Sequence, residues 1–139
     1  MTEFKKIRHS RDELIAKARA AMEGHSSIVF AYLFGSQARG APSPHSDIDI
    51  AVFVDTNDLA DEKLAIIGDL INRLGTDEID LVILNTAPLP LRARVLRKKE
   101  ILIDRKPHRR HLFESLVLRE YFDFSIKEDA ISKRRYSLG

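Results

Sequence analysis

The apolar positions of the chain follow two alternating patterns: short continuous runs, and spacings of three and four residues. Continuous runs rich in β-branched and aromatic residues predict buried strands. Apolar residues that recur every three or four positions predict amphipathic helices. The runs predict strands at residues 28–34, 47–54 and 78–84, and an edge strand at 101–103. The spacings predict helices at residues 11–23, 58–74, 88–99 and 108–133. This alternation predicts an α/β or α+β fold, in which helices cover a small mixed sheet of about four strands.

Residues with special backbone preferences mark the ends of these helices. Ser10 and Glu13 have the spacing of a capping box at the start of the first helix. Gly24 and Gly75 follow directly after two helical segments and are typical stop signals. Pro107 is expected to break the chain before a long C-terminal helix.

Composition narrows the class of protein. The chain has 139 residues, of which 44% are hydrophobic and 32% charged, as in an ordinary folded domain. It has no cysteine, which excludes disulfide bonds, thiolate zinc sites and cysteine nucleophiles. No apolar run is long enough to span a bilayer, and residues 1–6 lack the apolar segment of a secretory signal. We therefore expect a globular cytoplasmic protein with no membrane partner.

The pattern that indicates chemistry is Gly35-Ser36, followed after ten residues by Asp47-Ile48-Asp49. Side chains alternate along a strand, so Asp47 and Asp49 share one face. Asp80 occupies the same early position in the next predicted strand. If that strand is a neighbour of the second, the three carboxylates converge.

Three carboxylates on one face repel one another unless a cation neutralises them. Oxygen ligands of this kind suit Mg²⁺ or Mn²⁺, and two such ions about 3.5–4 Å apart can assist an in-line displacement at phosphorus. Gly35 lets the backbone approach a ligand closely, and Ser36 offers an N–H and a hydroxyl at the start of a short helix, where phosphates bind. Arg39 could add positive charge to the same oxygens. The predicted chemistry is nucleotidyl transfer from a triphosphate, with pyrophosphate as the leaving group.

The segment from Leu33 to Gly40, followed by Ser46 to Val52, resembles the signature of the polymerase-β-type nucleotidyltransferases. The short chain is most similar to the minimal nucleotidyltransferases (MNT), and the resemblance extends over residues 10–105. It implies a polymerase-palm fold, to which the apolar spacing of residues 108–133 adds a long C-terminal helix. We accordingly expect a catalytic domain at residues 1–107 and a helical extension packed on it at residues 108–139.

The resemblance also implies roles for the motif residues. Asp47 and Asp49 would ligate both Mg²⁺ ions, and Asp80 would ligate the catalytic ion and help to deprotonate the attacking hydroxyl. Gly35 and Ser36 would hold the β- and γ-phosphates of ATP, and Arg39 is carried over as a further nucleotide-binding residue.

Minimal nucleotidyltransferases commonly pair with an all-helical HEPN protein as antitoxin and toxin. The resemblance to the HepT–MntA type implies an antitoxin that transfers AMP from ATP onto a tyrosine of a HEPN ribonuclease. Two alternatives stay open: a non-catalytic antitoxin that occludes the toxin through its C-terminal segment, and nucleotidyl transfer to a small molecule or an RNA end.

Charge is distributed unevenly along the chain. Residues 92–135 carry 14 basic and 7 acidic residues, so they are strongly positive, whereas the remainder is acidic. The stretch 92–110 holds nine basic residues and could bind RNA phosphates, an acidic partner or the triphosphate, or form a solvated face. Direct nucleic-acid binding is not favoured. The apolar and aromatic residues of the C-terminal helix are better explained by core or partner packing than by base stacking, and we favour a partner-binding helix.

Overall fold

The structure is a computed structural model that describes residues 10–35 and 47–137, with side chains described up to residue 133. Its elements run in the predicted order of helices and strands. They are α1 (Arg11–Glu23), β1 (Ile28–Phe34), β2 (Ile48–Val54), α2 (Leu59–Leu74), β3 (Ile79–Ile83), α3 (Leu89–Arg97), β4 (Lys99–Asp104) and α4 (Pro107–Ser137). The predicted α+β class is therefore confirmed.

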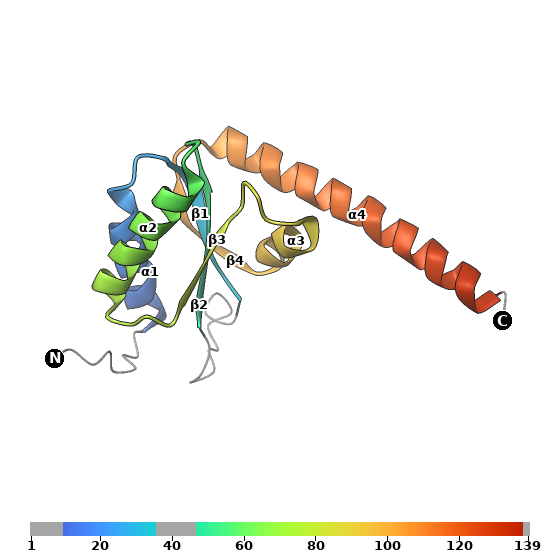
Figure 1. Ribbon diagram of the computed structural model, residues 1–139, viewed down its shortest axis with the longest axis horizontal. Helices are drawn as coiled ribbons and strands as arrows, with labels where there is room; N and C mark the ends of the chain where they lie inside the picture. Colours follow the sequence, from blue (N-terminus) through green and yellow to red (C-terminus); the bar gives the residue numbers. More distant parts are fainter. Residues whose placement is uncertain (1–9, 36–46, 138–139) are drawn as a thin grey trace.

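The four strands form one mixed sheet in the order β3-β2-β1-β4. The central strand β1 runs antiparallel to both β2 and β4, whereas β2 and β3 are parallel and are joined by the crossover helix α2. β4 lies at an edge, as predicted. Figure 1 shows the resulting twisted sheet edge-on between two groups of helices.

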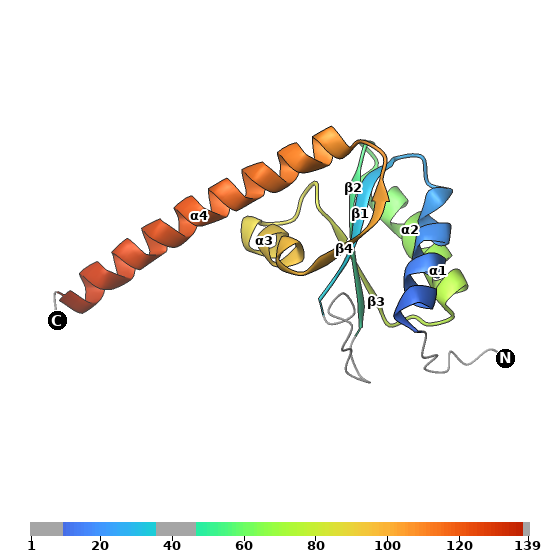
Figure 2. The ribbon, with the colours of Figure 1, turned by 180° about the vertical axis from the view of Figure 1, so that it is seen from behind.

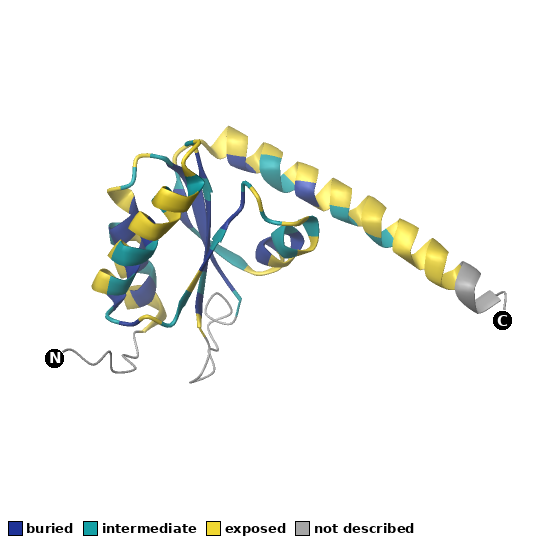
Figure 3. Cartoon of the chain, in the orientation of Figure 1, coloured by how far each residue is buried: buried dark blue, intermediate teal, exposed yellow. Residues whose placement is uncertain are grey.

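Helices cover the two faces of the sheet separately. α1 and α2 lie together on one face, and α3 with the beginning of α4 lies on the other (Figure 2). Each face has its own apolar core: Leu33, Ile50 and Leu70 belong to the first, and Phe30 and Tyr32 to the second. Because both faces are covered, all seven residues of β1 are buried, which explains its uninterrupted apolar sequence (Figure 3).

The predicted end signals act largely as expected. The Ser10 hydroxyl accepts a hydrogen bond from the Glu13 N–H at 3.2 Å and caps α1. α2 ends at Gly75, whose positive φ of 68° lets its N–H donate to the Ile71 carbonyl. Pro107 differs from the prediction: it opens α4 rather than breaking the chain before it. A proline is tolerated in the first turn of a helix, where its missing N–H has no helical acceptor.

Helix α4 is anchored to the body through its first turns. Arg110 is buried and forms ion pairs with Asp104 at 3.1 Å and Glu114 at 2.8 Å. The buried Tyr32 hydroxyl donates to Glu114 at 3.3 Å, and burial together with this carboxylate raises the Tyr32 pKa. Val117 is buried further along the same side of the helix.

Beyond this anchor, α4 projects away from the body (Figures 1 and 3). The helix has 31 residues, which corresponds to about 46 Å. Seven of the eight large apolar side chains that are exposed in the described part of the chain lie on it: Leu112, Leu116, Leu118, Phe122, Phe124, Ile126 and Ile131. No helix in residues 10–35 or 47–137 has the length and apolar character needed to cross a membrane.

Candidate active site

The pairing of β2 with β3 brings the predicted acids together. In the parallel register, Asp49 lies directly opposite Asp80, and Asp47 immediately precedes β2. Two residues further along the strands, Ala51 and Val82 belong to the core beneath α3 and α4. Since side chains alternate, Asp49 and Asp80 point to the same face of the sheet. The conditional expectation that the third strand adjoins the second is thus confirmed.

The three carboxylates interact electrostatically. Burial raises the pKa of the half-buried Asp49 carboxyl, and the negative charge of Asp80 raises it further. The positive charge of Arg94 lowers the pKa of Asp49, and the negative charge of Asp47 raises it by a smaller amount. This end of the sheet therefore concentrates negative charge that a bound cation would relieve.

Gly35 closes the site on the side of β1. Its φ is 72°, and a Cβ at this position would lie 2.5 Å from Oδ2 of Asp49. Phe34, the preceding residue, pairs with Asp49 in the register of β1 and β2. The chain therefore needs glycine here, both for its backbone conformation and for its contact with the carboxylate. The predicted phosphate-binding residues Ser36 and Arg39 lie outside the described residues.

The donor set fits a hard divalent cation. All three candidate ligands, Asp47, Asp49 and Asp80, offer carboxylate oxygen, which Mg²⁺ and Mn²⁺ prefer. Within residues 10–35 and 47–137, no group of three or more acidic or histidine side chains is arranged to hold a metal ion by itself. A Mg²⁺ ion bound by these carboxylates would therefore take waters and substrate oxygens as further ligands, as Mg²⁺ commonly does. When bound, such an ion would polarise phosphoryl oxygens.

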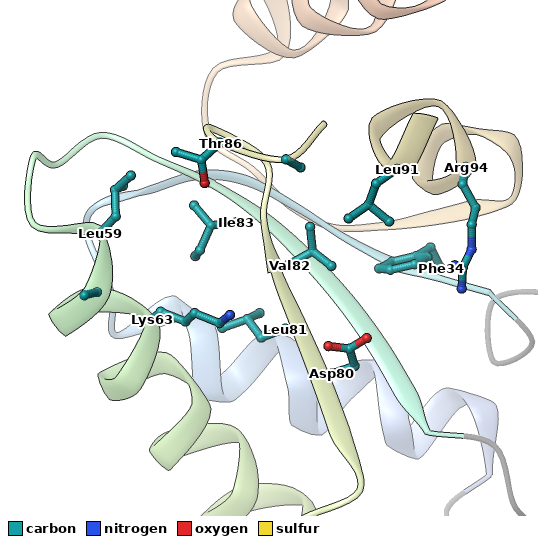
Figure 4. A pocket seen from close by; sticks show the side chains of 12 residues that line it. Phe34, Leu59, Lys63, Asp80, Leu81, Val82, Ile83, Thr86, Leu91 and Arg94 are labelled. Atoms are coloured by element: carbon teal, nitrogen blue, oxygen red, sulfur yellow. The ribbon is translucent and has the colours of Figure 1, made fainter. Parts of the chain in front are cut away.

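A cavity of about 540 Å³ adjoins Asp80 along the free edge of β3, between α2 and α3. Figure 4 shows Lys63 extending from α2 and Arg94 from α3, with Asp80 between them. The wall is polar and apolar in nearly equal parts; its other lining residues are Phe34, Leu59, Ala60, Leu81, Val82, Ile83, Thr86, Ala87 and Leu91.

The sequence does not distinguish the two cationic side chains of this cavity, Lys63 and Arg94, from the other basic residues of the chain. Lys63 is one of many exposed lysines and arginines, and Arg94 appeared only as one member of the basic stretch 92–110. Nothing in the local sequence around α3 indicates that this helix folds back over the acidic end of the sheet.

The basic stretch is not one surface, because several of its side chains serve the fold. The Arg92 guanidinium donates to the carbonyls of Leu84 and Asn85 at 3.0 and 2.9 Å. Arg105 donates to three carbonyls between the last residue of α1 and the first residue of β1, those of Glu23, His25 and Ile28. With Arg110 held in its ion pairs, these arginines have partners within the chain.

Comparison with known families identifies the class of protein. The family described as "Polymerase beta, Nucleotidyltransferase" matches residues 16–108, which include all four strands and the three acids. The chain belongs to this family and is a nucleotidyltransferase. No curated protein gives a significant match.

Several solved structures are similar over most of their length. A chain of a mutant MntA–HepT toxin–antitoxin complex is 26% identical, covers 88% of this chain and 95% of its own, and has a TM-score of 0.68. A chain of a toxin–antitoxin structure with AMP-PNP is 27% identical, covers 88% of this chain and 95% of its own, and has a TM-score of 0.67. A chain of the complex of a tri-AMPylated Shewanella oneidensis HEPN toxin with MNT antitoxin is 26% identical, covers 87% of this chain and 94% of its own, and has a TM-score of 0.66. The chain thus has the fold of nucleotidyltransferase chains found in toxin–antitoxin complexes.

Proposed function

We propose that the protein is a Mg²⁺-dependent antitoxin that transfers AMP from ATP onto a tyrosine of a HEPN-type ribonuclease toxin and thereby neutralises it. The observation that carries the proposal is the register that places Asp49 opposite Asp80, with Asp47 beside them and Gly35 against Asp49. The similarity to a chain from a complex with an AMPylated HEPN toxin supports the choice of reaction and acceptor.

The proposed roles follow from this geometry and from the family resemblance. Asp47 and Asp49 would ligate two Mg²⁺ ions, and Asp80 would ligate one of them and accept the proton of the attacking hydroxyl. Gly35 and Ser36 would hold the β- and γ-phosphates of ATP, with Arg39 as a further contact. Mn²⁺ could replace Mg²⁺, since both ions prefer oxygen ligands.

The proposal assigns catalysis to residues 1–107 and toxin binding to residues 108–139, in the cytoplasm, where ATP is supplied. Exposed apolar side chains on α4 support the second assignment. Phe122 and Ile126 are one helical turn apart and are 65% and 52% exposed, although such side chains are normally buried. A helical partner could cover them by packing alongside the projecting part of α4.

One assay tests the catalytic account. The protein is incubated with Mg²⁺, ATP labelled on its α-phosphate, and the HEPN-type protein encoded beside it. We expect label on the partner with the wild-type chain and none with the double variant Asp47→Ala/Asp49→Ala. Asp12→Ala removes an exposed carboxylate on α1 and serves as the matched control, which should label the partner normally.

The same exposed face of α4 favours a second candidate, in which the antitoxin acts by occlusion. Full neutralisation of toxin activity by the double variant, without any label, would favour occlusion and contradict the catalytic account. Label on an RNA end or a small molecule, and none on the protein, would redirect the proposal to another acceptor.

A further inference from the structure

The end of the cavity at Asp80 lies on the other side of Asp49 from Gly35. In the sheet, β2 stands between β1, which ends at Phe34 beside Gly35, and β3, which carries Asp80. Gly35 contacts Asp49 from the side of β1, whereas the cavity opens beside Asp80 on the side of β3. Asp49 thus lies between Gly35 and Asp80, and the cavity borders Asp80 and extends to Phe34.

This arrangement has a consequence for a displacement at phosphorus. In an in-line reaction, the attacking and leaving oxygens lie on opposite sides of the phosphorus atom. If the β- and γ-phosphates lie at Gly35, as the proposed function requires, pyrophosphate leaves on the side of β1. The attacking hydroxyl must then arrive from the side of β3, where the cavity is.

We propose that this cavity receives the hydroxyl-bearing aromatic side chain of the acceptor protein, not the nucleoside of ATP, and that Lys63 and Arg94 select acceptors with acidic neighbours. The inference rests on the proposed function for the position of the leaving group. In the reaction, the phenolic oxygen forms a bond to the α-phosphorus of ATP, and the bond from that phosphorus to the bridging oxygen breaks. Pyrophosphate leaves with the electron pair, and the phenolic proton passes to the Asp80 carboxylate.

The lining of the cavity suits such an acceptor. Phe34, Val82 and Leu91 provide apolar surface for a ring near the polar end at Asp80. Lys63 and Arg94 add two positive charges at the rim. Both side chains are exposed, and neither forms a hydrogen bond or ion pair with another residue in the described part of the chain. The charge of Lys63 is therefore available to acidic groups of a partner, whereas the charge of Arg94 also acts on Asp49.

Kinetics with the HEPN-type partner provide the first test. Ala87→Trp fills the cavity with a bulky side chain, and Lys63→Glu reverses the charge on its α2 side. We expect each to raise the KM for the partner about tenfold or more, since each opposes the acceptor by steric or like-charge repulsion. The dissociation constant of AMP-PNP in the presence of Mg²⁺ should stay within about twofold of the wild-type value. Arg73→Glu is the matched control, because Arg73 is exposed on the same helix as Lys63 but does not line the cavity.

The two measurements separate failure of this inference from failure of the proposed function. Weaker AMP-PNP binding with an unchanged KM for the partner would show that the cavity holds the nucleotide, and would overturn the inference. Label on no protein, even with wild-type enzyme that binds AMP-PNP, would refute the proposed acceptor instead.

A binding measurement then decides the inference without turnover. A short peptide with one tyrosine between two aspartates is titrated into ¹⁵N-labelled protein saturated with AMP-PNP and Mg²⁺. Shifts at the amides of Ala87, Leu91 and Arg94, which disappear in Ala87→Trp, would support the cavity as the acceptor site. Absence of these shifts, or shifts confined to other elements, would overturn it.

Discussion

Replacing Gly35 by alanine tests how closely the backbone at the end of β1 approaches the acidic site. The residue has a φ of 72°, a conformation that L-residues rarely adopt. The new methyl carbon would also lie 2.5 Å from Oδ2 of Asp49, so the substitution acts on a candidate metal ligand. One added carbon atom should therefore affect both stability and chemistry.

The two effects have different sizes. The left-handed conformation costs an alanine about 1–2 kcal/mol of unfolding free energy, which lowers Tm by roughly 3–10 °C for a chain of this length. The fold should survive, since domains have about 5–15 kcal/mol of stability. To restore a 3.4 Å contact, the Asp49 carboxylate must move by about 0.9 Å. Misplacement of a reacting group by about 1 Å can reduce a rate about 100-fold.

We therefore expect Gly35→Ala to remain folded at 25 °C and to transfer AMP about 100-fold more slowly than the wild type. Thermal unfolding and initial rates of partner labelling measure the two effects on the same preparations. Gly68→Ala is the control, because Gly68 lies inside α2 and a Cβ there meets nothing within 4 Å. It should raise stability by about 0.5–1 kcal/mol and leave transfer unchanged.

Two results would refute this reasoning. One is a wild-type rate in Gly35→Ala, which would mean that the Asp49 carboxylate need not occupy its observed position. The other is a rate that falls only in proportion to the unfolded fraction, since the loss would then report stability and not geometry.

Other substitutions test the remaining features of the structure. Arg110→Met leaves Asp104 without its cation, while Glu114 keeps Lys99 at 3.3 Å, so urea unfolding should show a loss of about 3 kcal/mol. Arg11→Met, in an exposed pair, should cost less than about 1 kcal/mol, and equal losses would contradict the anchoring role. The pKa of Asp49 is raised in the folded state, so the charged carboxylate costs stability as pH rises through that pKa. Asp49→Asn should accordingly unfold at a higher temperature than the wild type at pH 7 in EDTA while losing transfer, and a lower Tm would contradict the repulsion. Phe122→Glu should weaken partner binding about tenfold or more in calorimetry, with stability unchanged within about 0.5 kcal/mol. The control Leu64→Glu changes an equally exposed apolar residue on α2 and should bind the partner normally. If both variants weaken partner binding equally, α4 is not the docking surface.

The sheet and its acidic residues could be predicted from the sequence, because the burial of a strand and the alternation of its side chains determine which positions are apolar. β1 is covered on both faces and reads as seven consecutive apolar residues. Asp49 and Asp80 interrupt the apolar pattern at equivalent early positions of two strands joined by one helix, and such strands pair in parallel. The positions of Asp49, Asp80 and Gly35 therefore followed from local pattern, whereas their catalytic roles remain proposals.

The cavity could not be predicted, since it depends on how two helices pack and not on any local pattern. Lys63 and Arg94 are 31 positions apart and meet the same cavity from opposite sides of β3. The roles of the side chains in the basic stretch 92–110 could not be predicted from the sequence either. Arg92 donates to backbone carbonyls 7 and 8 positions earlier in the chain, and Arg105 donates to carbonyls 77 and 80 positions earlier, so neither role follows from the basic pattern itself.

The sheet also divides the molecule between two tasks. The core beneath α1 and α2 contains none of the candidate catalytic side chains, whereas the acids and the exposed part of α4 belong to the other side. Substitutions that improve packing or helix propensity on the α1–α2 side can therefore accumulate without disturbing the chemistry, provided that they spare the α2 residues of the cavity, Leu59, Ala60 and Lys63. A chain of this size can in this way vary its acceptor on one side and compensate for the lost stability on the other. For an engineer, the α1–α2 layer is the place to add stability before the opposite face is altered for a new acceptor.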